Sequence, residues 1–277
     1  MTKELTIAFI GGGNMATALG AGLIGKRCGA HDVHVVDVQE SVLERWTSQG
    51  STGAAAPDAV LATRRIWIFA VKPQYMKEAV QACRPFLQPD TLVISIAAGI
   101  SSDTLAHWLG TPDQPWTRLI RCMPNTPALI GAGASGLMAM PGASEDDRAV
   151  AQQLMAAVGD VVWVSTDHDL DVITGLSGSG PAYVFLFIDA LIQGGIAQGL
   201  SAEHARTLAL ATVTGATQLA GMSHESLTVL RERVTSKGGT TAAAVDVLQR
   251  RQFSTIIQSA MQAAADRAAE LSTEFSK

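Results

Sequence analysis

Cysteine, aromatic residues and clustered positive charge are scarce in this 277-residue sequence, and each shortage narrows the possible functions. The 20 Lys and Arg residues stand against 25 Asp and Glu, a formal net charge of −5, and they form no basic run. Because sequence-independent nucleic-acid binding requires clustered Lys and Arg, we expect no nucleic-acid partner. The three cysteines, Cys28, Cys83 and Cys122, are odd in number and far apart, which is typical of unpaired thiols in a reducing compartment.

Metal-ligand spacings and convincing membrane-spanning runs are also lacking. The six histidines form no H-x-x-H or H-E-x-x-H pattern, so we predict no metal site. The apolar run near the amino terminus has the length of one strand, shorter than a signal peptide requires. The uncharged stretch from Val172 to Ile188 is interrupted by Gly, Ser and Pro, whereas a membrane span needs roughly 20 apolar residues. We therefore expect a cytoplasmic protein with no membrane partner.

The first part of the chain alternates short apolar runs with helical patterns. Alternation of this kind predicts an α/β Rossmann domain over residues 1–164, with a doubly wound, mostly parallel sheet. The runs rich in Val and Ile predict strands over residues 5–10, 33–38, 65–71, 91–98, 117–123 and 160–165. The intervening segments predict helices over residues 15–26, 41–50, 75–86, 102–110 and 144–159.

The strand pattern ends near Ser165, and the rest of the chain is helical in character. Apolar and Ala positions recur at helical spacing over residues 167–199, 201–221, 223–234 and 240–275. We therefore predict an all-α domain over residues 165–277. Its helices are apolar on more than one face, and exposed apolar patches of that size are unusual on monomers, so we expect a dimerisation domain.

A glycine-rich motif follows the first predicted strand. Gly11, Gly13 and Ala16 have G-x-G-x-x-A spacing: Gly11 permits a tight turn, Gly13 lets the backbone approach a pyrophosphate, and Ala16 permits close helix–strand packing. The helix that begins there would present free N–H groups to phosphates. This context indicates dinucleotide binding. The alternative is a glycine-rich turn without a ligand.

Asp37 ends the second predicted strand, where a carboxylate can accept hydrogen bonds from the adenosine ribose and would repel a 2′-phosphate. This position favours NADH over NADPH. The alternatives are that Asp37 caps the following helix, or that Arg45, Arg64 or Arg65 reaches a 2′-phosphate.

Two further strand ends are predicted to line the nicotinamide half of the cofactor. Val71 and Pro73 in "AVKPQ" would bring backbone close to it, and Lys72 is better explained as a fixed loop position or an ion pair than as a catalytic acid. Ala97 and Ala98 end another strand with small side chains, which leaves room for a ring.

The segment "GLSGSGPAY", Gly175 to Tyr183, combines small residues with a proline inside a predicted helix. The backbone there can approach a ligand closely, although a kinked helix packed on a neighbour would use the same residues. From Val172 to Gly195 there is no Lys, His or Arg. Dehydrogenases that act on alcohols and ketones need a group to move the hydroxyl proton, whereas reduction of a protonated imine mainly requires orientation beside the nicotinamide.

A second glycine-rich helix start, "TSKGGTT", lies near the end of the chain. The glycine pair permits a sharp turn, and free N–H groups with the hydroxyls of Ser236 and the following threonines suit a carboxylate. The alternative is ordinary helix capping by Thr240 or Thr241. Together the motifs favour a cyclic imine that carries a carboxylate.

The motifs "GGGNMA", "AVKPQ", "SIAAG", "RCMPNTP", "GLSGSGPAY" and "VTSKGGTT" occur in that order, and with them the chain resembles the Δ1-pyrroline-5-carboxylate reductases over nearly its whole length. The resemblance implies NAD(P)H-dependent reduction of pyrroline-5-carboxylate to L-proline, the last step of proline biosynthesis. It also implies an interlocked homodimer that can assemble further to a decamer. In such a dimer "SKGGTT" can complete the partner's cofactor site.

The resemblance also implies residue roles. The hydroxyl of Thr241 is expected to hydrogen-bond the ring nitrogen, which makes it the catalytic residue. Asn125 and Thr126 are expected to border the nicotinamide pocket. The substrate carboxylate is assigned to Ser236, Gly239, Thr240 and Thr241. The cofactor is assigned to Gly11, Gly12, Gly13, Asn14, Met15, Ala16, Asp37, Ala70, Val71, Lys72, Pro73, Ala97, Ala98 and Asn125.

Two positions depart from the family's pattern, and two other functions compete. Many members have a non-acidic residue near Asp37, in keeping with the common NADPH preference, and Arg233 stands where Asn is frequent. A β-hydroxyacid dehydrogenase is disfavoured because it would need a helix lysine. The alternatives left open are a reductase of another cyclic imine, such as a piperideine carboxylate, and a non-catalytic nucleotide-binding sensor.

Overall fold

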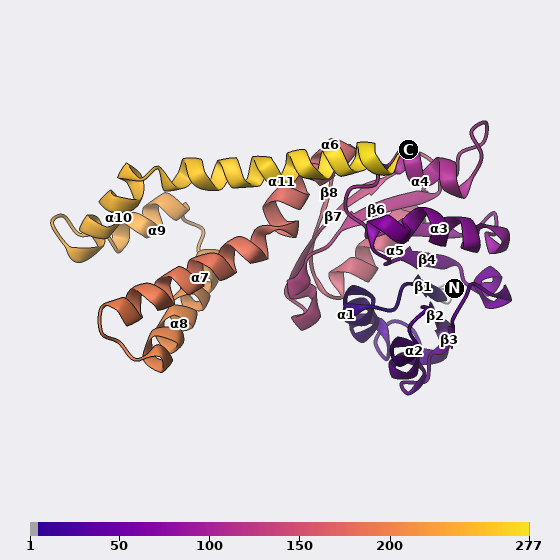
Figure 1. Ribbon diagram of the computed structural model, residues 1–277, viewed down its shortest axis with the longest axis horizontal. Coiled ribbons are helices and arrows are strands. Elements are labelled where there is room, and N and C mark those ends of the chain that lie inside the picture. The colour runs from indigo at the N-terminus through magenta and orange to yellow at the C-terminus, as the bar shows by residue number, and fades with distance from the viewer. Residues whose placement is uncertain (1–4, 277) are drawn as a thin grey trace. The chain divides into compact units, whose positions relative to one another are not determined.

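The structure, a computed structural model, describes residues 5–276. The chain forms two compact units (Figure 1). One unit comprises the residues up to Ser179 together with the carboxy-terminal segment from Gln262. The other comprises Gly180–Met261.

An eight-stranded sheet forms the centre of the first unit, with strand order β3-β2-β1-β4-β5-β6-β7-β8. All neighbouring strands pair in parallel except β6 and β7, which are antiparallel, so the predicted mostly parallel sheet is confirmed. The strands are β1 (Ile7–Ile10), β2 (Val33–Val36), β3 (Thr52–Ala54), β4 (Ile66–Phe69), β5 (Leu92–Ser95), β6 (Leu119–Met123), β7 (Gly133–Ala139) and β8 (Gly159–Trp163).

Two strands, β3 and β7, are absent from the sequence prediction. Both are rich in small residues, "TGA" and "GASGLMA", and lack the Val and Ile runs that mark the other strands. Their extended conformation is stabilised by pairing with neighbours rather than by local propensity, which is weak in β-structure. β7 lies between β6 and β8 and pairs with both.

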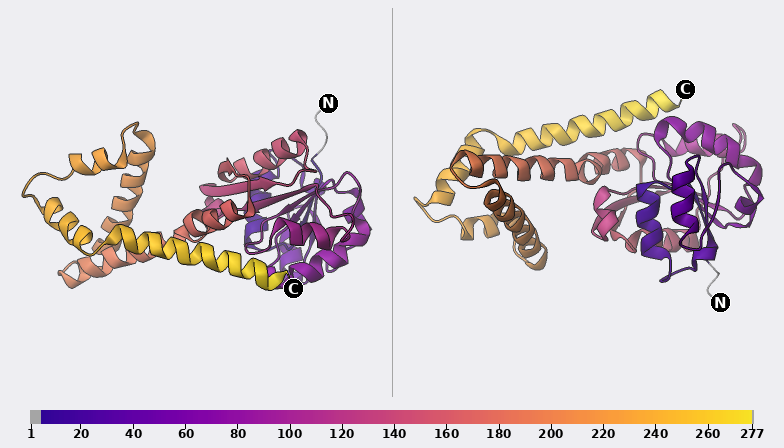
Figure 2. Two further views of the ribbon diagram at one scale, coloured as in Figure 1. Left: turned by 90° about the horizontal axis from the view of Figure 1, so that it is seen from above. Right: turned by 60° about the horizontal axis from the view of Figure 1, so that its bottom comes forward.

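Helices cover both faces of the sheet (Figures 1 and 2). On one face α1 (Asn14–Leu23), α2 (Glu40–Thr47) and α5 (Glu145–Ala156) pack on apolar side chains such as Ile7 and Phe9. On the other face α3 (Pro73–Cys83) and α4 (Ser102–Leu109) pack on residues that include Trp67 and Phe69. The side chains alternate between these two cores because successive strand residues point to opposite faces.

Two ion pairs link helices to β6 and to Arg118, the residue that precedes it. Arg118 Nη2 lies 2.7 Å from Asp147 Oδ1 on α5, and the Asp147 carboxylate also accepts hydrogen bonds from Ser144, the N-cap of that helix. Arg121 pairs with Asp167 at the start of α6 (Asp167–Ile173), and Asp167 Oδ2 also accepts a 2.7 Å bond from Ser102 Oγ. These pairs fix α4, α5 and α6 relative to the sheet.

The helical half of the chain is more broken than predicted. The segment predicted as 167–199 contains α6, a one-turn π-helix at Thr174–Gly178 (the π-turn), and α7 (Gly180–Ala197). The prediction of one helix over 240–275 is wrong: α10 (Thr240–Arg250) and α11 (Phe253–Phe275) are separated at Gln252, whose φ is 56°. Between α7 and α10 in sequence lie α8 (Ala202–Met222) and α9 (Leu227–Arg233).

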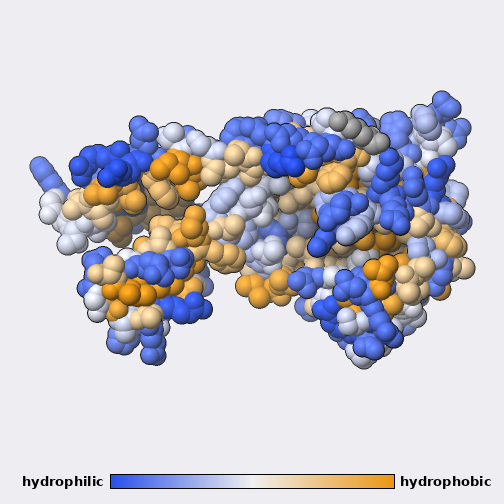
Figure 3. All heavy atoms as spheres, in the orientation of Figure 1, coloured by the Kyte–Doolittle hydropathy of each residue, from blue (hydrophilic) through white to orange (hydrophobic). Residues whose placement is uncertain are grey.

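Many large apolar side chains of the second unit are exposed, and α7 and α8 pack as an antiparallel hairpin within it. Orange patches over these helices are visible in Figure 3. Phe185 and Leu186 on α7 are 65% and 72% exposed, and Leu219 on α8 is 60% exposed. The helical run Asp167–Ala197 contains an 18-residue window with mean hydropathy 1.4, so it is long and apolar enough to cross a membrane by length and composition alone.

Candidate active site

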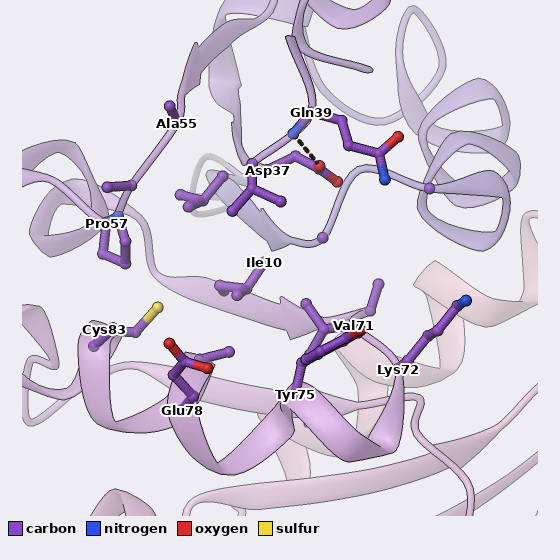
Figure 4. Close-up of a pocket in the computed structure, with 18 residues that line it drawn as sticks. Ile10, Asp37, Gln39, Ala55, Pro57, Val71, Lys72, Tyr75, Glu78 and Cys83 are labelled. Atoms are coloured by element: carbon purple, nitrogen blue, oxygen red, sulfur yellow. Dashed lines mark hydrogen bonds between the residues drawn. The ribbon is translucent and has the colours of Figure 1, made fainter. Parts of the chain in front are cut away.

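A pocket of about 750 Å³ lies at the carboxyl ends of β1, β2 and β4, where a doubly wound sheet binds nucleotides (Figure 4). Ile10 forms its floor. One wall comes from the segments after β2 and β3, and the other from α3 and the residues just before it. Of the residues predicted to bind the cofactor, those in the lining are Gly11, Gly13, Asp37, Ala70, Val71 and Lys72.

The three glycines after β1 serve different purposes. Gly11 has φ +95°, and a Cβ there would stand 2.8 Å from the Ala70 carbonyl, so any side chain is excluded. A Cβ on Gly12 would stand 2.7 Å from Val42 Cγ1, so this residue lets α2 pack closely. Gly13, the N-cap of α1, has no heavy atom of the described chain within 4 Å of such a Cβ. Gly13 therefore leaves space that the protein itself does not fill, as approach of a pyrophosphate to the backbone requires.

Of the other predicted residues of this motif, two pack in the core and one is exposed. Ala16 is fully buried against the sheet, in keeping with close helix–strand packing. Met15 packs against the same core, while Asn14 is exposed at the first turn of α1. No side chain among the described residues caps α1, and its first turn holds no acidic residue, so its positive end stays open to an anion.

The Asp37 carboxylate is held by backbone N–H groups. Oδ2 accepts a 2.8 Å bond from Gly12 N, and Oδ1 accepts a 2.9 Å bond from Gln39 N. These two bonds, of which Figure 4 draws the one from Gln39, fix the carboxylate at the pocket wall. Each oxygen keeps a second lone pair for a ligand hydroxyl. The first residue of α2 is Glu40 and its N-cap is Gln39, so Asp37 is not the cap of that helix.

The basic residues considered for a 2′-phosphate do not line this pocket. Arg64 and Arg65 precede β4, at the amino edge of the sheet, where Arg64 Nη2 bonds the His31 carbonyl. Asp37 lies at the carboxyl edge, because it follows β2. Parallel strands point the same way, so residues before and after them lie on opposite edges. Arg45, in the last turn of α2, is also absent from the lining.

The wall formed by α3 was only partly predicted. Tyr75, Glu78, Ala79 and Cys83 join Val71 and Lys72 in the lining, whereas Pro73, the first residue of α3, does not. Helical spacing after "AVKPQ" is the sequence signal that could have found them, because residues three or four apart share a helix face. On the opposite wall Ala55, Ala56 and Pro57 follow the unpredicted β3.

The three cysteines form no disulfide bond with one another. Cys28, Cys83 and Cys122 are all free thiols, with the latter two buried and Cys28 half-buried. Burial raises the pKa of Cys83 to about 12, so this thiol at the pocket wall is protonated at neutral pH. Among residues 5–276 no group of three or more His, Cys, Asp or Glu is arranged to hold a metal ion.

Small residues after β5 form a second turn at the same edge of the sheet. Ala97 is buried and Ala98 is half-buried. Gly99 has φ +69°, and a Cβ there would stand 2.7 Å from Leu271 Cβ on α11. This turn is therefore held against α11. Neither alanine lines the pocket described above.

Asn125 joins three segments instead of lining that pocket. Its Nδ2 donates a 3.0 Å bond to the Ser177 carbonyl in the π-turn, and its Oδ1 accepts a 2.8 Å bond from Ala134 N on β7. The residue is 8% exposed. Thr126, which follows it, is exposed at the start of a 3₁₀ turn.

The segment Ser236–Thr241 forms the amino end of α10. Gly238 has φ +71°, and Gly239 N donates a 3.0 Å bond to the Ser236 carbonyl, which turns the chain into the helix. Gly239 is the N-cap, and no side chain of the described residues caps the helix, so capping by Thr240 or Thr241 is not observed. Ser236 and Thr240 are exposed and Thr241 is half-buried.

Arg233 forms an ion pair within its own unit. Its Nη2 lies 2.5 Å from Glu225 Oε1, and both side chains are partly exposed. The pair links the last turn of α9 to the segment that precedes this helix. Arg233 is therefore paired with Glu225 even when no ligand is bound.

Comparison with known proteins gives matches over nearly all of the chain. Residues 167–271 match the family described as pyrroline-5-carboxylate reductase dimerisation, and residues 6–99 match that described as NADP oxidoreductase, coenzyme F420-dependent. The chain is similar to the pyrroline-5-carboxylate reductase of Pseudomonas aeruginosa, with 40% identity over 97% of each chain.

Solved structures give the same result. The chain is similar to a pyrroline-5-carboxylate reductase from Coxiella burnetii, with TM-score 0.89, 35% identity, and coverage of 98% of this chain and 99% of that one. The structure of Plasmodium falciparum pyrroline carboxylate reductase with NADP bound gives TM-score 0.86 at 24% identity, covering 98% and 100%, which supports the fold.

Proposed function

Since this chain belongs to the pyrroline-5-carboxylate reductase family, we propose that the pocket beside Gly13 and Asp37 holds the cofactor and that the amino end of α10 holds the substrate carboxylate. The chain is an NAD(P)-dependent oxidoreductase that reduces the C=N bond of pyrroline-5-carboxylate to give L-proline, the final step of proline biosynthesis. The observation that carries the site assignment is the open, uncapped start of α10.

The pocket is proposed to hold the nicotinamide cofactor in a fixed position for hydride transfer. When bound, the nicotinamide cofactor supplies the hydride. The open space at Gly13 and the uncapped start of α1 support a pyrophosphate site there, with Asn14, Met15 and Ala16 contributing backbone N–H groups. Gly11, Gly12, Ala70, Val71, Lys72 and Pro73 are proposed to shape the backbone around the cofactor, and Ala97 and Ala98 to leave room for its ring.

The amino end of α10 is proposed to bind the substrate carboxylate. The first turn of an α-helix has N–H groups without intrahelical partners, and the helix dipole favours negative charge there. The hydroxyls of Ser236 and Thr240 are exposed beside these N–H groups. A Cβ on Gly239 would stand 2.5 Å from Ser236 Oγ, so the glycine lets this hydroxyl lie close to the helix start.

Thr241 is proposed to orient the reacting ring. Its hydroxyl accepts a hydrogen bond from the protonated imine nitrogen, which keeps the C=N bond polarised while the hydride is added to carbon. No proton has to be delivered to the ring in that step, because the imine nitrogen already carries it. The lack of Lys, His and Arg from Val172 to Gly195 accords with such a substrate.

NADH is the proposed preferred cofactor. The charged side chains in the lining are Asp37, Glu78 and Lys72, so acidic groups outnumber basic ones around the adenosine half. A carboxylate fixed by Gly12 N and Gln39 N cannot swing away from a 2′-phosphate without breaking two bonds. The Plasmodium falciparum relative binds NADP, so both cofactors belong in the assay.

The helical region is proposed to form a homodimer, and dimers to assemble further, up to a decamer. The family's dimerisation region begins at residue 167, which supports a functional boundary near residue 165. A second copy would cover the exposed apolar residues of α7 and α8, and this accounts for the hydropathy of Asp167–Ala197 without a membrane. We propose the cytoplasm as the location of the protein.

The direct test follows oxidation of NADH and of NADPH at the nicotinamide absorbance with pyrroline-5-carboxylate as substrate, and identifies L-proline as product. We expect turnover with both cofactors and higher kcat/KM with NADH. A piperideine carboxylate serves as the competing substrate, because one methylene changes discrimination by only about 10- to 200-fold. A folded protein that binds NADH but reduces neither imine would contradict the proposal.

A further inference from the structure

The carbonyl of Ser177 loses its normal helical partner because of the sequence. In a continuous helix this carbonyl would accept a hydrogen bond from the N–H of the residue four positions later. That residue is Pro181, which has no N–H, and a proline ring also crowds the carbonyl four residues before it. The π-turn accommodates the proline, and Ser179 N bonds Thr174 O at 2.8 Å, five residues back.

Asn125 supplies the donor that Pro181 lacks. Its Nδ2 lies 3.0 Å from the Ser177 carbonyl oxygen, and Ala134 N holds the other end of the amide at 2.8 Å. The side chain is therefore oriented by β7 and directed at the π-turn. The neighbouring Gly178 lies directly over Met123, since a Cβ on Gly178 would stand 2.5 Å from Met123 Cε.

We propose that Asn125 is a positioning residue for the reaction: it replaces the N–H absent from Pro181 and so holds Ser177 to Gly180 in the conformation that receives the substrate ring. The inference rests on the proposed function only in taking this small-residue segment to border the substrate. It changes the role expected of Asn125, from direct cofactor contact to support of the π-turn. Both polar atoms of the amide are already bonded, and the side chain is 8% exposed.

The decisive variant is Asn125→Asp, which keeps the size of the side chain and the acceptor for Ala134 N. The carboxylate has no hydrogen to donate and sets an anion against the Ser177 carbonyl. We expect kcat/KM for pyrroline-5-carboxylate to fall by about 10- to 100-fold, since small misplacements near a reacting group have effects of that size. The Kd of NADH, measured by fluorescence, should change less than about twofold. Gln114→Glu, on an exposed turn, is the control for added charge.

Pro181→Ala provides the rescue. The alanine introduced by this substitution has an N–H that can bond the Ser177 carbonyl, so the loss caused by Asn125→Asp should be smaller in the Pro181→Ala background. A residue that contacts the cofactor directly would show no such coupling. Protonation of the carboxylate introduced by Asn125→Asp also restores a donor, so the activity of this variant relative to wild type should rise as the pH is lowered.

Hydrogen–deuterium exchange separates this inference from the proposed reaction. Amide exchange of a peptide that spans residues 174–184 should increase in Asn125→Asp and recover in the double variant, whichever imine the enzyme reduces. Unchanged kinetics and exchange, or a rise in the NADH Kd equal to the loss of kcat/KM, would overturn the inference. If Asn125→Asp alone does not fold, a folded and active double variant supports it and an unfolded one overturns it.

Discussion

The two units of the molecule differ in how completely each buries its own apolar residues. In the first unit β1, β2, β4 and β5 are buried along their whole length between two helical layers. In the second, no described residue of α7, α9 or α10 is buried, and α8 buries only Ala205 and Ala209. The first unit thus completes its own core, whereas the second presents surface for another copy of the chain, as its family's dimerisation role requires.

The same contrast separates the two glycine-rich helix starts. At Gly11 and Gly12 the chain's own atoms occupy the space that a side chain would need. At Gly238 no described atom lies within 4 Å of a Cβ, and the glycine is required only by its φ of +71°. The first motif is thus packed against the residues after β4 and against α2, whereas in the second motif a Cβ on Gly239 would meet only Ser236 of the same turn.

The largest expected effect comes from charging the open surface of the second unit. In Phe185→Glu/Leu186→Glu, two carboxylates would have to be buried in an apolar interface, so we expect the dimer dissociation constant to rise by about 100-fold or more. Light scattering after size exclusion measures the assembly, and the imine assay measures the accompanying loss of turnover. A stable, fully active monomer would contradict the need for a second copy, and Gln114→Glu is the charge control.

Thr241→Ala tests the open helix start itself. Loss of one positioned hydrogen bond to the ring nitrogen should lower kcat by about 10- to 1,000-fold. Thermal unfolding should be nearly unchanged, since Thr241 caps no helix. Thr273→Ala, which removes an exposed hydroxyl from α11, is the matched control. Wild-type kinetics for Thr241→Ala would remove the catalytic role assigned to this residue.

Arg118→Gln tests how much an internal ion pair stabilises the first unit, which buries its own core. Asp147 would stay buried with its Ser144 bonds but lose the guanidinium, which should lower the free energy of unfolding by about 2–3 kcal/mol. Burial alone would raise the pKa of Asp147, but hydrogen bonds from Arg118 and Ser144 and the charge of Arg118 hold it below its usual range.

The stability difference between wild type and Arg118→Gln should depend on pH, because folding lowers the pKa of Asp147. A carboxyl whose pKa is lowered by folding adds stability above its unfolded pKa of about 3.9, and this stability is lost as the pH falls through the lowered value. Urea unfolding of wild type and Arg118→Gln should therefore differ by a constant amount near neutral pH, and the two should converge in acid. A difference that widens below about pH 4 would contradict the assigned pairing.

The smallest expected effect concerns Asp37. Asp37→Ser removes the fixed negative charge at the ribose end of the pocket, so the ratio of kcat/KM with NADPH to that with NADH should rise about tenfold, equivalent to about 1.4 kcal/mol. Glu78→Gln on the opposite wall is the matched control, because it removes one charge without touching Gly12 or Gln39. An unchanged ratio in Asp37→Ser would leave Asp37 with only its role as an acceptor for two backbone N–H groups.

Local patterns predicted the parts of the fold that are stabilised locally. The Val- and Ile-rich strands and the helices between them were predicted because the period of a side-chain pattern reflects the geometry of its own element. β7 and the break at Gln252 were not predicted. β7 depends on pairing with β6 and β8, and the sequence around Gln252 carries neither Gly nor Pro.

The candidate site likewise contains residues that local patterns predicted and residues that they did not predict. Gly11, Gly13 and Asp37 were found from spacing, because each is tied to the end of one strand. Glu78 and Pro57 line the same pocket but were missed, since their positions depend on α3 and on β3. Asn125 was assigned from the family resemblance, and its bonds to Ser177 and Ala134 depend on two other segments of the chain.

The sequence by itself determined the α/β order of the first half, the helical character of the second, the glycine fingerprint and the family. These are recorded in neighbouring residues, whose backbone preferences and side-chain periods act within one element. Only the tertiary structure decided that Asn125 meets the Ser177 carbonyl, which lies 52 residues further along the chain and cannot bond an N–H of Pro181 four positions later. Such a contact depends on two distant segments packing together, and no local preference encodes it.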